Sequence, residues 1–494
     1  MRTFYHSTRS SATTVTSKQA ILQGLAPDGG LFVTDAVDQM ELDYKSLLSK
    51  NYQDQACVVL STLLGDYTDE EIGRCVKKAY SNQFDNPDIT PVTKIGDDWL
   101  LELFHGPTCA FKDIALQMLP QLMSVARGES EDSVMIVTAT SGDTGKAALE
   151  GFADVPGCGV TVFYPAGKVS DIQHLQMVCQ KGSNVAVCGV RGTFDDAQTG
   201  VKEIFSDPEL NARLAQRHIK LSSANSINIG RLVPQVTYYF FVYSKLVERE
   251  AIKAGDKVDF CVPTGNFGDV LAGYLAKKLD LPIRHLIVAS NANNVLTNFI
   301  TTGRYDRRRP FIKTISPSMD ILVSSNLERL LYYESDGDAD YVASLMQQLN
   351  DEGYYEVTKS VKERIQKTFL AGYADDAVTK KTIKETFENE DRLVDPHTAV
   401  AKTVLDSIES DGVQRVCLST ASPFKFSADV LSALGKDTAG KDGFECMDEL
   451  AKLAGLAAPK QLSELRSAPQ LHKDVEDLDQ MPAFVENSCT RIFR

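Results

Sequence analysis

Residues 101–117 read LELFHGPTCAFKDIALQ, and this stretch constrains the interpretation of the whole chain. A short apolar run at 100–104 ends at a His-Gly-Pro-Thr segment, and Gly-Pro is a turn signal. From Ala110 onward, apolar residues recur at helical spacing. Lys112 therefore lies where an apolar loop becomes a helix.

The position of Lys112 has a chemical consequence. A lysine in an apolar loop loses its proton more easily than one in water, because desolvation disfavours the ammonium form. A neutral lysine amine forms a Schiff base with an aldehyde, which is how enzymes hold pyridoxal phosphate. Most lysines at helix starts are solvated, so a surface lysine is the commoner interpretation of this stretch alone.

The composition is that of an ordinary globular protein. The chain has 494 residues, 43% of them hydrophobic and 24% charged, which predicts about two or three domains. A net charge of −15 argues against nucleic acids and anionic membranes as partners, so an anionic ligand needs a local basic site. The ten cysteines form no C-x-x-C pair and lack zinc-ligand spacing, which favours free thiols and no metal site.

Two further observations concern membranes and targeting. The N-terminal residues lack the apolar segment of a signal peptide. The longest nearly uncharged apolar stretch, 232–244, is too short to span a bilayer. We therefore expect a soluble protein of the cytoplasm.

The middle of the chain alternates between short apolar runs and helical patterns. This alternation predicts a parallel sheet covered on both faces, with ligands at the carboxyl ends of its strands. The predicted strands cover residues 134–137, 160–164, 184–187, 219–222, 258–262, 286–289 and 413–418. The predicted helices cover residues 144–152, 171–181, 193–205, 231–254 and 269–279.

The pattern also suggests how the chain is divided. Thr68 and Glu71 have capping-box spacing, so a helix is expected to start there. We expect an N-terminal domain (1–98), an α/β core (99–303), an inserted helical lobe (304–390), the return of the core (391–435) and a C-terminal segment (436–494).

Four loops carry small polar residues where a ligand could bind. Residues 140–145 (TSGDTG) place hydroxyls and free amides at a helix start, which suits an anion or a plain N-cap. Residues 263–269 (PTGNFGD) suit a single phosphate or a tight turn, and contain neither a dinucleotide fingerprint nor a P-loop. Residues 418–421 (LSTA) offer a hydroxyl to a ring nitrogen, although a Ser/Thr turn is simpler. Residues 222–231 end at an arginine and suit a small oxyanion, or a capping loop.

Several of these segments together resemble one family. FHGPTCAFKD, TATSGDTG, SANSINIGR, VPTGNFGDVLAGY, DPHTAVA and LSTASPFKF, in this order, resemble threonine synthases of the longer bacterial and fungal branch. That family consists of pyridoxal-phosphate enzymes with the tryptophan-synthase β-like fold (fold type II). The resemblance implies an α/β protein with two parallel-sheet lobes, an N-terminal domain and an inserted helical lobe.

The resemblance also implies a reaction and roles for particular residues. The family consists of carbon–oxygen lyases acting on phosphates, which convert O-phospho-L-homoserine and water to L-threonine and phosphate, the last step of threonine biosynthesis. Lys112 would be the catalytic residue and would bind pyridoxal phosphate. The other residues implied in cofactor binding are Gly265, Asn266, Phe267, Gly268, Asp269 and Thr420. Those implied in substrate binding are Ser141, Gly142, Asp143, Thr144, Asn225, Ser226, Asn228 and Arg231.

Three departures from the family pattern leave alternatives open. Ser422 stands where the family commonly has histidine, and Ile229 and Ala292 stand where it commonly has an aromatic and an acidic residue. One alternative is a phospholyase that eliminates phosphate and releases 2-oxobutanoate. A dehydratase of the same fold is disfavoured by the N-terminal GLAPDGG segment. A non-catalytic binding protein is disfavoured by the intact Lys112 and GNFG loop. For the enzyme we expect a small-molecule substrate and a monomer or homodimer.

Overall fold

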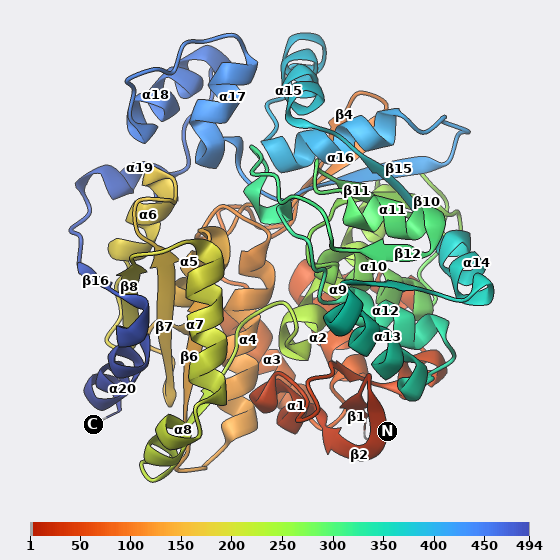
Figure 1. The fold of residues 1–494 in the computed structure, drawn as a ribbon. Coiled ribbons are helices and arrows are strands. Elements are labelled where there is room, and N and C mark those ends of the chain that lie inside the picture. Colours follow the sequence, from red (N-terminus) through yellow and green to blue (C-terminus); the bar gives the residue numbers. More distant parts are fainter. Residues whose placement is uncertain (1–2, 494) are drawn as a thin grey trace.

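The computed structural model describes residues 3–493, which fold around two main β-sheets (Figure 1). The first sheet has six strands in the order β14-β11-β10-β15-β5-β4. Neighbouring strands run parallel, except that β4 pairs antiparallel with β5. These strands are β4 (Val92–Ile95), β5 (Asp98–Glu102), β10 (Val258–Pro263), β11 (Ile283–Ser290), β14 (Phe369–Tyr373) and β15 (Gln414–Ser419).

The second sheet has five strands, and every pairing in it is parallel. Its order is β16-β8-β7-β6-β9. These strands are β6 (Ser133–Ala139), β7 (Cys158–Pro165), β8 (Val185–Val190), β9 (Ile219–Ser222) and β16 (Asp474–Glu476). Strands β7 and β8 are buried along their whole length, as expected of a parallel sheet with both faces covered.

Helices pack against both sheets. Helix α4 (Lys112–Arg127) contacts α5 (Asp143–Phe152) and α9 (Ile229–Glu248). Helix α9 is apolar around most of its circumference and is almost entirely buried. The other core helices are α6 (Asp171–Val178), α7 (Phe194–Ser206), α8 (Pro208–Ala215), α10 (Gly268–Lys278), α11 (Val295–Thr302) and α16 (Pro396–Asp406).

The N-terminal region has a small sheet and three helices. Strands β1 (Phe4–Ser7), β2 (Ser10–Thr16) and β3 (Phe32–Val33) form the sheet. The helices are α1 (Ser17–Gln23), α2 (Tyr52–Leu63) and α3 (Asp69–Ala79). The predicted capping box at the start of α3 is confirmed, since Thr68 and Glu71 each accept a hydrogen bond from the other's backbone.

Residues 304–390 contain four helices and three strands. Strands β12 (Arg304–Asp306) and β13 (Tyr354–Glu356) pair with each other, whereas β14 returns to the first sheet beside β11. This region is therefore not helical throughout, and β14 escaped prediction because its five residues lie between charged helices. The helices are α12 (Leu327–Glu334), α13 (Ala339–Glu352), α14 (Lys359–Thr368) and α15 (Asp376–Glu390).

The last part of the chain is ordered into helices and one strand. Strand β16 extends the second sheet, and α20 (Met481–Ile492) contacts α7 and β7. The other helices are α17 (Ser427–Ala433), α18 (Gly443–Ala454) and α19 (Lys460–Ser463).

Most elements predicted from the sequence are confirmed, and so is the α/β class with two parallel-sheet lobes. Helix α9 ends at Glu248 rather than at 254, where the chain turns and Glu250 has a φ of 57°. Across residues 3–493, no helix is both long and apolar enough to cross a membrane. The division of the chain into these five segments stays a prediction.

Candidate active site

The loop before α4 is fixed by the residue that follows Lys112. The Asp113 carboxylate accepts hydrogen bonds from the Thr108 N–H (2.9 Å) and hydroxyl (2.7 Å). A Cβ at Gly106 would lie 2.5 Å from the Asp113 side chain, so this close turn requires glycine. Cys109 in the same loop has a φ of 58°, which is uncommon for a residue with a side chain. The sequence thus folds the loop so that Lys112 opens the helix.

The amine of Lys112 is buried beside one carboxylate. Its Nζ lies 3.1 Å from Oγ of Ser318 and 3.5 Å from Oδ2 of Asp143, and the residue is 8% exposed. Burial lowers the pKa of Lys112 to about 8, although the charge of Asp143 acts in the opposite direction. A larger fraction of this amine is therefore neutral near pH 7 than in an ordinary solvated lysine.

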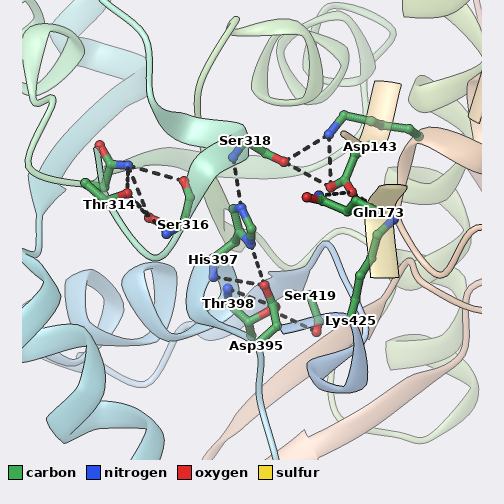
Figure 2. A network of polar contacts seen from close by, with 12 residues as sticks. Asp143, Gln173, Thr314, Ser316, Ser318, Asp395, His397, Thr398, Ser419 and Lys425 are labelled. Carbon is green, nitrogen blue, oxygen red and sulfur yellow. Dashed lines mark hydrogen bonds and ion pairs between the residues drawn. The ribbon is translucent and has the colours of Figure 1, made fainter. Parts of the chain in front are cut away.

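Asp143 connects several of these side chains at the start of α5 (Figure 2). Its Oδ1 accepts from Nζ of Lys425 (2.8 Å) and Nε2 of Gln173 (2.9 Å), and its Oδ2 accepts from the Ser318 hydroxyl (3.1 Å). Burial alone would raise the pKa of Asp143, but Lys425 and Lys112 hold it well below its usual range. Asp143 is therefore a permanent anion between two lysines.

Positive charge exceeds negative charge around Lys112. Arg231 is 5% exposed and, among the described residues, the one hydrogen bond of its side chain goes to the Ala224 carbonyl (2.9 Å). Burial lowers the pKa of Arg231 to about 10. The charges of Arg231 and Lys425 both lower the pKa of Lys112, whereas Asp143 is the carboxylate whose charge raises it. This local excess of positive charge suits an anionic ligand, although the chain as a whole has a net charge of −15.

The loop between β10 and α10 presents free backbone N–H groups. Within residues 3–493, the N–H groups from Gly265 to Asp269 have no hydrogen-bond acceptor. Its carbonyls are engaged instead: Gly265 accepts from the Ser324 hydroxyl (2.8 Å) and Asn266 from the Asn326 amide (3.0 Å). Free N–H groups at a helix start form a cup suited to one phosphate.

Two residues of this cup have additional roles in the fold. Phe267 adopts a left-handed conformation, with a φ of 62°, at the position before α10. The Asp269 carboxyl accepts from the hydroxyls of Tyr238 (2.5 Å) and Tyr239 (3.0 Å), which anchors the cup to α9. Burial raises the pKa of Asp269 to about 6.

The loop before α5 leaves two further N–H groups free. The Thr140 hydroxyl oxygen accepts from the N–H groups of Gly142 and Gly145, both at 2.9 Å. The N–H groups of Asp143 and Thr144 have no acceptor in the described chain. Ser141 is exposed, and Gly142 has a φ of 147° and lies against the side chain of Gln173.

The residues predicted as ligands in the stretch 222–231 differ in whether they lie near Lys112. Arg231 reaches the surroundings of Lys112, as described above. Asn228 does not, because its buried amide donates to the Ile21 carbonyl (3.0 Å) and its oxygen caps the N–H of Gly230 (2.9 Å). Asn225 accepts from the Thr138 hydroxyl (3.0 Å), and the Ser226 carbonyl accepts from Asn326 (3.1 Å).

The end of β15 lies beside the loop of Lys112. The Thr420 carbonyl accepts from the Phe111 N–H (2.8 Å), and Ala421 pairs with Ala110. Thr420 is therefore held next to the residue that precedes Lys112, with its side chain largely buried.

Sequence reasoning missed Lys425, Ser318 and Gln173. Lys425 lies in a Pro-Phe-Lys-Phe segment after a buried strand, which is the same apolar context that marked Lys112. Ser318 and Gln173 carry no such signal, since each meets Asp143 only through the fold.

A buried amine, a phosphate-sized cup of free N–H groups and surplus positive charge, carried on two parallel sheets, are typical of α/β enzymes that hold an anionic aldehyde cofactor. Comparison with known proteins agrees with this class. Three family models match the chain: "Threonine synthase N terminus" over residues 4–80, "Pyridoxal-phosphate dependent enzyme" over 94–356 and "Threonine synthase, C-terminal" over 398–485.

Individual proteins are also similar to the chain. Threonine synthase of Saccharomyces cerevisiae is 38% identical, with 87% of this chain and 89% of that protein covered. Human threonine synthase-like 1 is 39% identical over 84% of this chain, which spans 58% of that longer relative. The crystal structure of pyridoxal-phosphate-bound threonine synthase from Brucella melitensis has a TM-score of 0.87 at 34% identity, covering 98% of this chain and 99% of that one. The chain belongs to the threonine synthase family of pyridoxal-phosphate dependent enzymes.

Proposed function

We propose that the protein converts O-phospho-L-homoserine and water to L-threonine and phosphate with pyridoxal phosphate as its cofactor. The observation that carries the proposal is the amine of Lys112, which is buried, has a pKa of about 8 and lies in a site with surplus positive charge. Family membership supports the same reaction.

The residues present fit the cofactor. In the proposal, Lys112 would hold it covalently, the N–H groups from Gly265 to Asp269 would bind its phosphate, and Thr420 would face its ring nitrogen. The unpaired N–H groups support the phosphate assignment, because free backbone N–H groups at the start of a helix form a site for an anion. Pyridoxal phosphate, when bound, supplies an electron sink that makes protons of an amino-acid substrate removable.

The chain's own residues supply proton transfer and charge compensation. Lys112 is the proposed proton acceptor, since its amine is partly neutral near pH 8. Asp143 stabilises the ammonium that forms, because its own pKa is held too low for it to take the proton. The Ser318 hydroxyl, in contact with both groups, orients the amine.

A substrate with a carboxylate and a phosphate needs two anion sites. We assign Arg231 and the start of α5, with the free N–H groups of Asp143 and Thr144 and the neighbouring Ser141 and Gly142. Asn225 and Ser226 border this region, and Asn228 serves the fold instead because its amide is fully engaged.

The test is one incubation of the purified protein with pyridoxal phosphate and O-phospho-L-homoserine. Phosphate, threonine and 2-oxobutanoate are then quantified together, with the Lys112→Ala protein as control. Phosphate matched by threonine supports the proposal. Phosphate matched by 2-oxobutanoate makes the protein a phospholyase, and no phosphate from the wild type would favour a binding protein.

We further propose that the enzyme works in the cytoplasm as a monomer or homodimer, without nucleic acid or membrane partners. All ten cysteines are free thiols, which supports a reducing compartment. The net charge of −15 disfavours polyanionic partners. Arg308 and Arg309, in the basic run after β12, are bound to Asp306 (2.7 Å) and Asn294 (2.6 Å), which fits a structural role.

A further inference from the structure

A short 3-10 turn, η3 (Pro317–Met319), lies over the amine of Lys112 and over the phosphate cup. The Ser318 hydroxyl contacts Lys112 and Asp143, both at 3.1 Å. On the other side, a Cβ added at Gly265 would lie only 2.7 Å from the Ser318 carbonyl oxygen. The position of Ser318 therefore determines the surroundings of both parts of the site.

The backbone of Ser318 is held by a buried histidine. The Ser318 N–H donates to Nε2 of His397 (3.1 Å), and Nδ1 of His397 lies 2.6 Å from Oδ2 of Asp395. Since Nε2 accepts a hydrogen bond, the ring proton resides on Nδ1 and is donated to Asp395. Both side chains are buried, with 2% and 0% exposure. His397 is thereby fixed in one tautomer and one orientation (Figure 2).

Asp395 is in turn fixed to rigid elements. It caps the start of α16 and accepts from the N–H groups of His397 (2.9 Å) and Thr398 (3.1 Å) and from the Thr398 hydroxyl. The Thr398 hydroxyl also bonds the Ser419 hydroxyl (3.0 Å) at the end of β15. The chain of contacts therefore runs from the first sheet to Ser318.

The ends of the segment around η3 have separate anchors. Oδ1 of Asp320 accepts from the Thr314 hydroxyl and the Asn291 amide, both at 2.7 Å. These contacts fix where the segment begins and ends, whereas the contact with His397 holds its middle at Ser318. Loss of the His397 contact would therefore free Ser318 without unfolding the segment.

We propose that His397 is a positioning residue for Lys112, acting through the backbone of Ser318 to keep the Ser318 hydroxyl on the lysine amine. The proposal rests on the proposed role of Lys112. Without His397, Ser318 relaxes, water reaches Nζ, and the desolvation that lowers the pKa of Lys112 is partly lost. A rise of about one pKa unit reduces the neutral fraction of the amine at pH 8 roughly fivefold.

The test uses the full chain without cofactor. Acetylation of Lys112 by acetic anhydride is followed by peptide mass spectrometry as a function of pH, and the rate of pyridoxal phosphate attachment is measured at pH 8. The labelling midpoint is the pH at which the acetylation rate of Lys112 is half its maximum. We expect His397→Ala to raise this midpoint by about one pH unit and to slow the attachment of pyridoxal phosphate roughly fivefold. His397→Gln, whose side-chain oxygen can accept from the Ser318 N–H, should restore both values towards those of the wild type.

The controls separate positioning from folding. His472→Ala removes a partly buried histidine elsewhere in the fold, bonded to the Gln180 carbonyl (3.0 Å), and should change neither value. An unchanged midpoint in folded His397→Ala, or no recovery in His397→Gln, would overturn the proposal. If His397→Ala does not fold, Ser318→Ala carries the test and must raise the midpoint. If no pyridoxal phosphate attaches to the wild type, the proposed function fails, while the labelling midpoints still report on positioning.

Discussion

Nζ of Lys112 lies 3.5 Å from Oδ2 of Asp143, yet the pKa of this lysine is below its ordinary value. Burial outweighs the attraction of the carboxylate, and Lys425 shares that carboxylate at 2.8 Å. The positive charges of Arg231 and Lys425 also disfavour a third cation nearby. The site therefore keeps a reactive amine while retaining the carboxylate that stabilises its protonated form.

The first prediction concerns the pH dependence of cofactor attachment. Only the neutral amine attacks an aldehyde, so the attachment rate should rise with pH through the pKa of Lys112, which is about 8. The attachment rate is measured from the change in absorbance after addition of pyridoxal phosphate, at pH values from 6 to 10, and its midpoint gives the pKa of Lys112. Lys359, whose side chain is 89% exposed, serves as a solvated internal reference for acetylation in the same protein. A midpoint for Lys112 equal to that of Lys359 would contradict the prediction.

The second prediction concerns Asp143→Asn. This change leaves Lys425, with a fully buried side chain, without its ion-pair partner, and should lower the free energy of unfolding by about 3 kcal/mol. It should also lower the pKa of Lys112 further, because the carboxylate that favours the ammonium is gone. Urea denaturation and pH-dependent acetylation measure the two effects. Asp477→Asn breaks an exposed ion pair with Arg191 and should change neither quantity.

Much of the fold could be predicted from the sequence because buried parallel strands are continuous apolar runs. Strands such as β6 and β10 are bounded by turn signals, and the helices between them have clear periodicity. Strand β14 could not be predicted, since Phe369–Tyr373 contains glycine and is too short to show a period. Its place is determined by pairing with β11, which only the folded chain provides.

The site was predictable only where chemistry and local sequence coincide. Lys112 stands out because a lysine in an apolar loop is unusual, and the glycines at 265 and 268 mark a close backbone approach. Ser318 is 206 residues from Lys112 in the chain, so no local pattern can connect them. For Asn228 the local sequence does not show that its side chain caps α9 and donates to a carbonyl of α1, because Ile21 lies 207 residues away in the chain.

The third prediction concerns His105, in the loop before Lys112. Burial disfavours its protonated form, but hydrogen bonds to Asp85 (2.6 Å) and Glu102 (2.9 Å) prevail and raise the pKa to about 9. Because the folded pKa exceeds the unfolded value of ~6.5, the stabilisation is complete below ~6.5 and is lost as pH rises through about 9. The difference in unfolding free energy between wild type and His105→Gln should therefore shrink over that interval.

The fourth prediction concerns Arg231→Met. An arginine that is buried and has no carboxylate partner among residues 3–493 disfavours folding, so its replacement should raise the free energy of unfolding by about 1 kcal/mol in phosphate-free buffer. The same change should raise the KM for O-phospho-L-homoserine at least ~10-fold, because a charge-assisted hydrogen bond to the substrate is lost. Arg329→Met should instead destabilise the protein, since Arg329 donates to the Phe32 carbonyl (2.9 Å) and the Ile227 carbonyl (2.6 Å). Loss of stability in Arg231→Met with an unchanged KM would assign Arg231 to the fold.

The fifth prediction compares two glycines of the phosphate cup. In Gly265→Ala the new Cβ would lie 2.7 Å from the Ser318 carbonyl oxygen and 3.4 Å from Cα of Met319, both backbone atoms that cannot rotate away. In Gly268→Ala the nearest atom is the Asn326 side-chain nitrogen at 3.4 Å, so the fold has room for the methyl group.

Both substitutions add a methyl group next to the proposed phosphate position, but only Gly265→Ala must displace Ser318 from Lys112. We therefore expect Gly265→Ala to lose about 1–3 kcal/mol of unfolding free energy and to raise the labelling midpoint of Lys112, whereas Gly268→Ala weakens pyridoxal phosphate binding alone. Urea denaturation, acetylation and a binding titration on each protein separate these effects. Equal acetylation midpoints of Lys112 in the two variants would contradict this prediction. The two proteins would then differ in crowding at the backbone of Ser318 but not in the pKa of the lysine, so the close contact between Gly265 and Ser318 would not control that pKa.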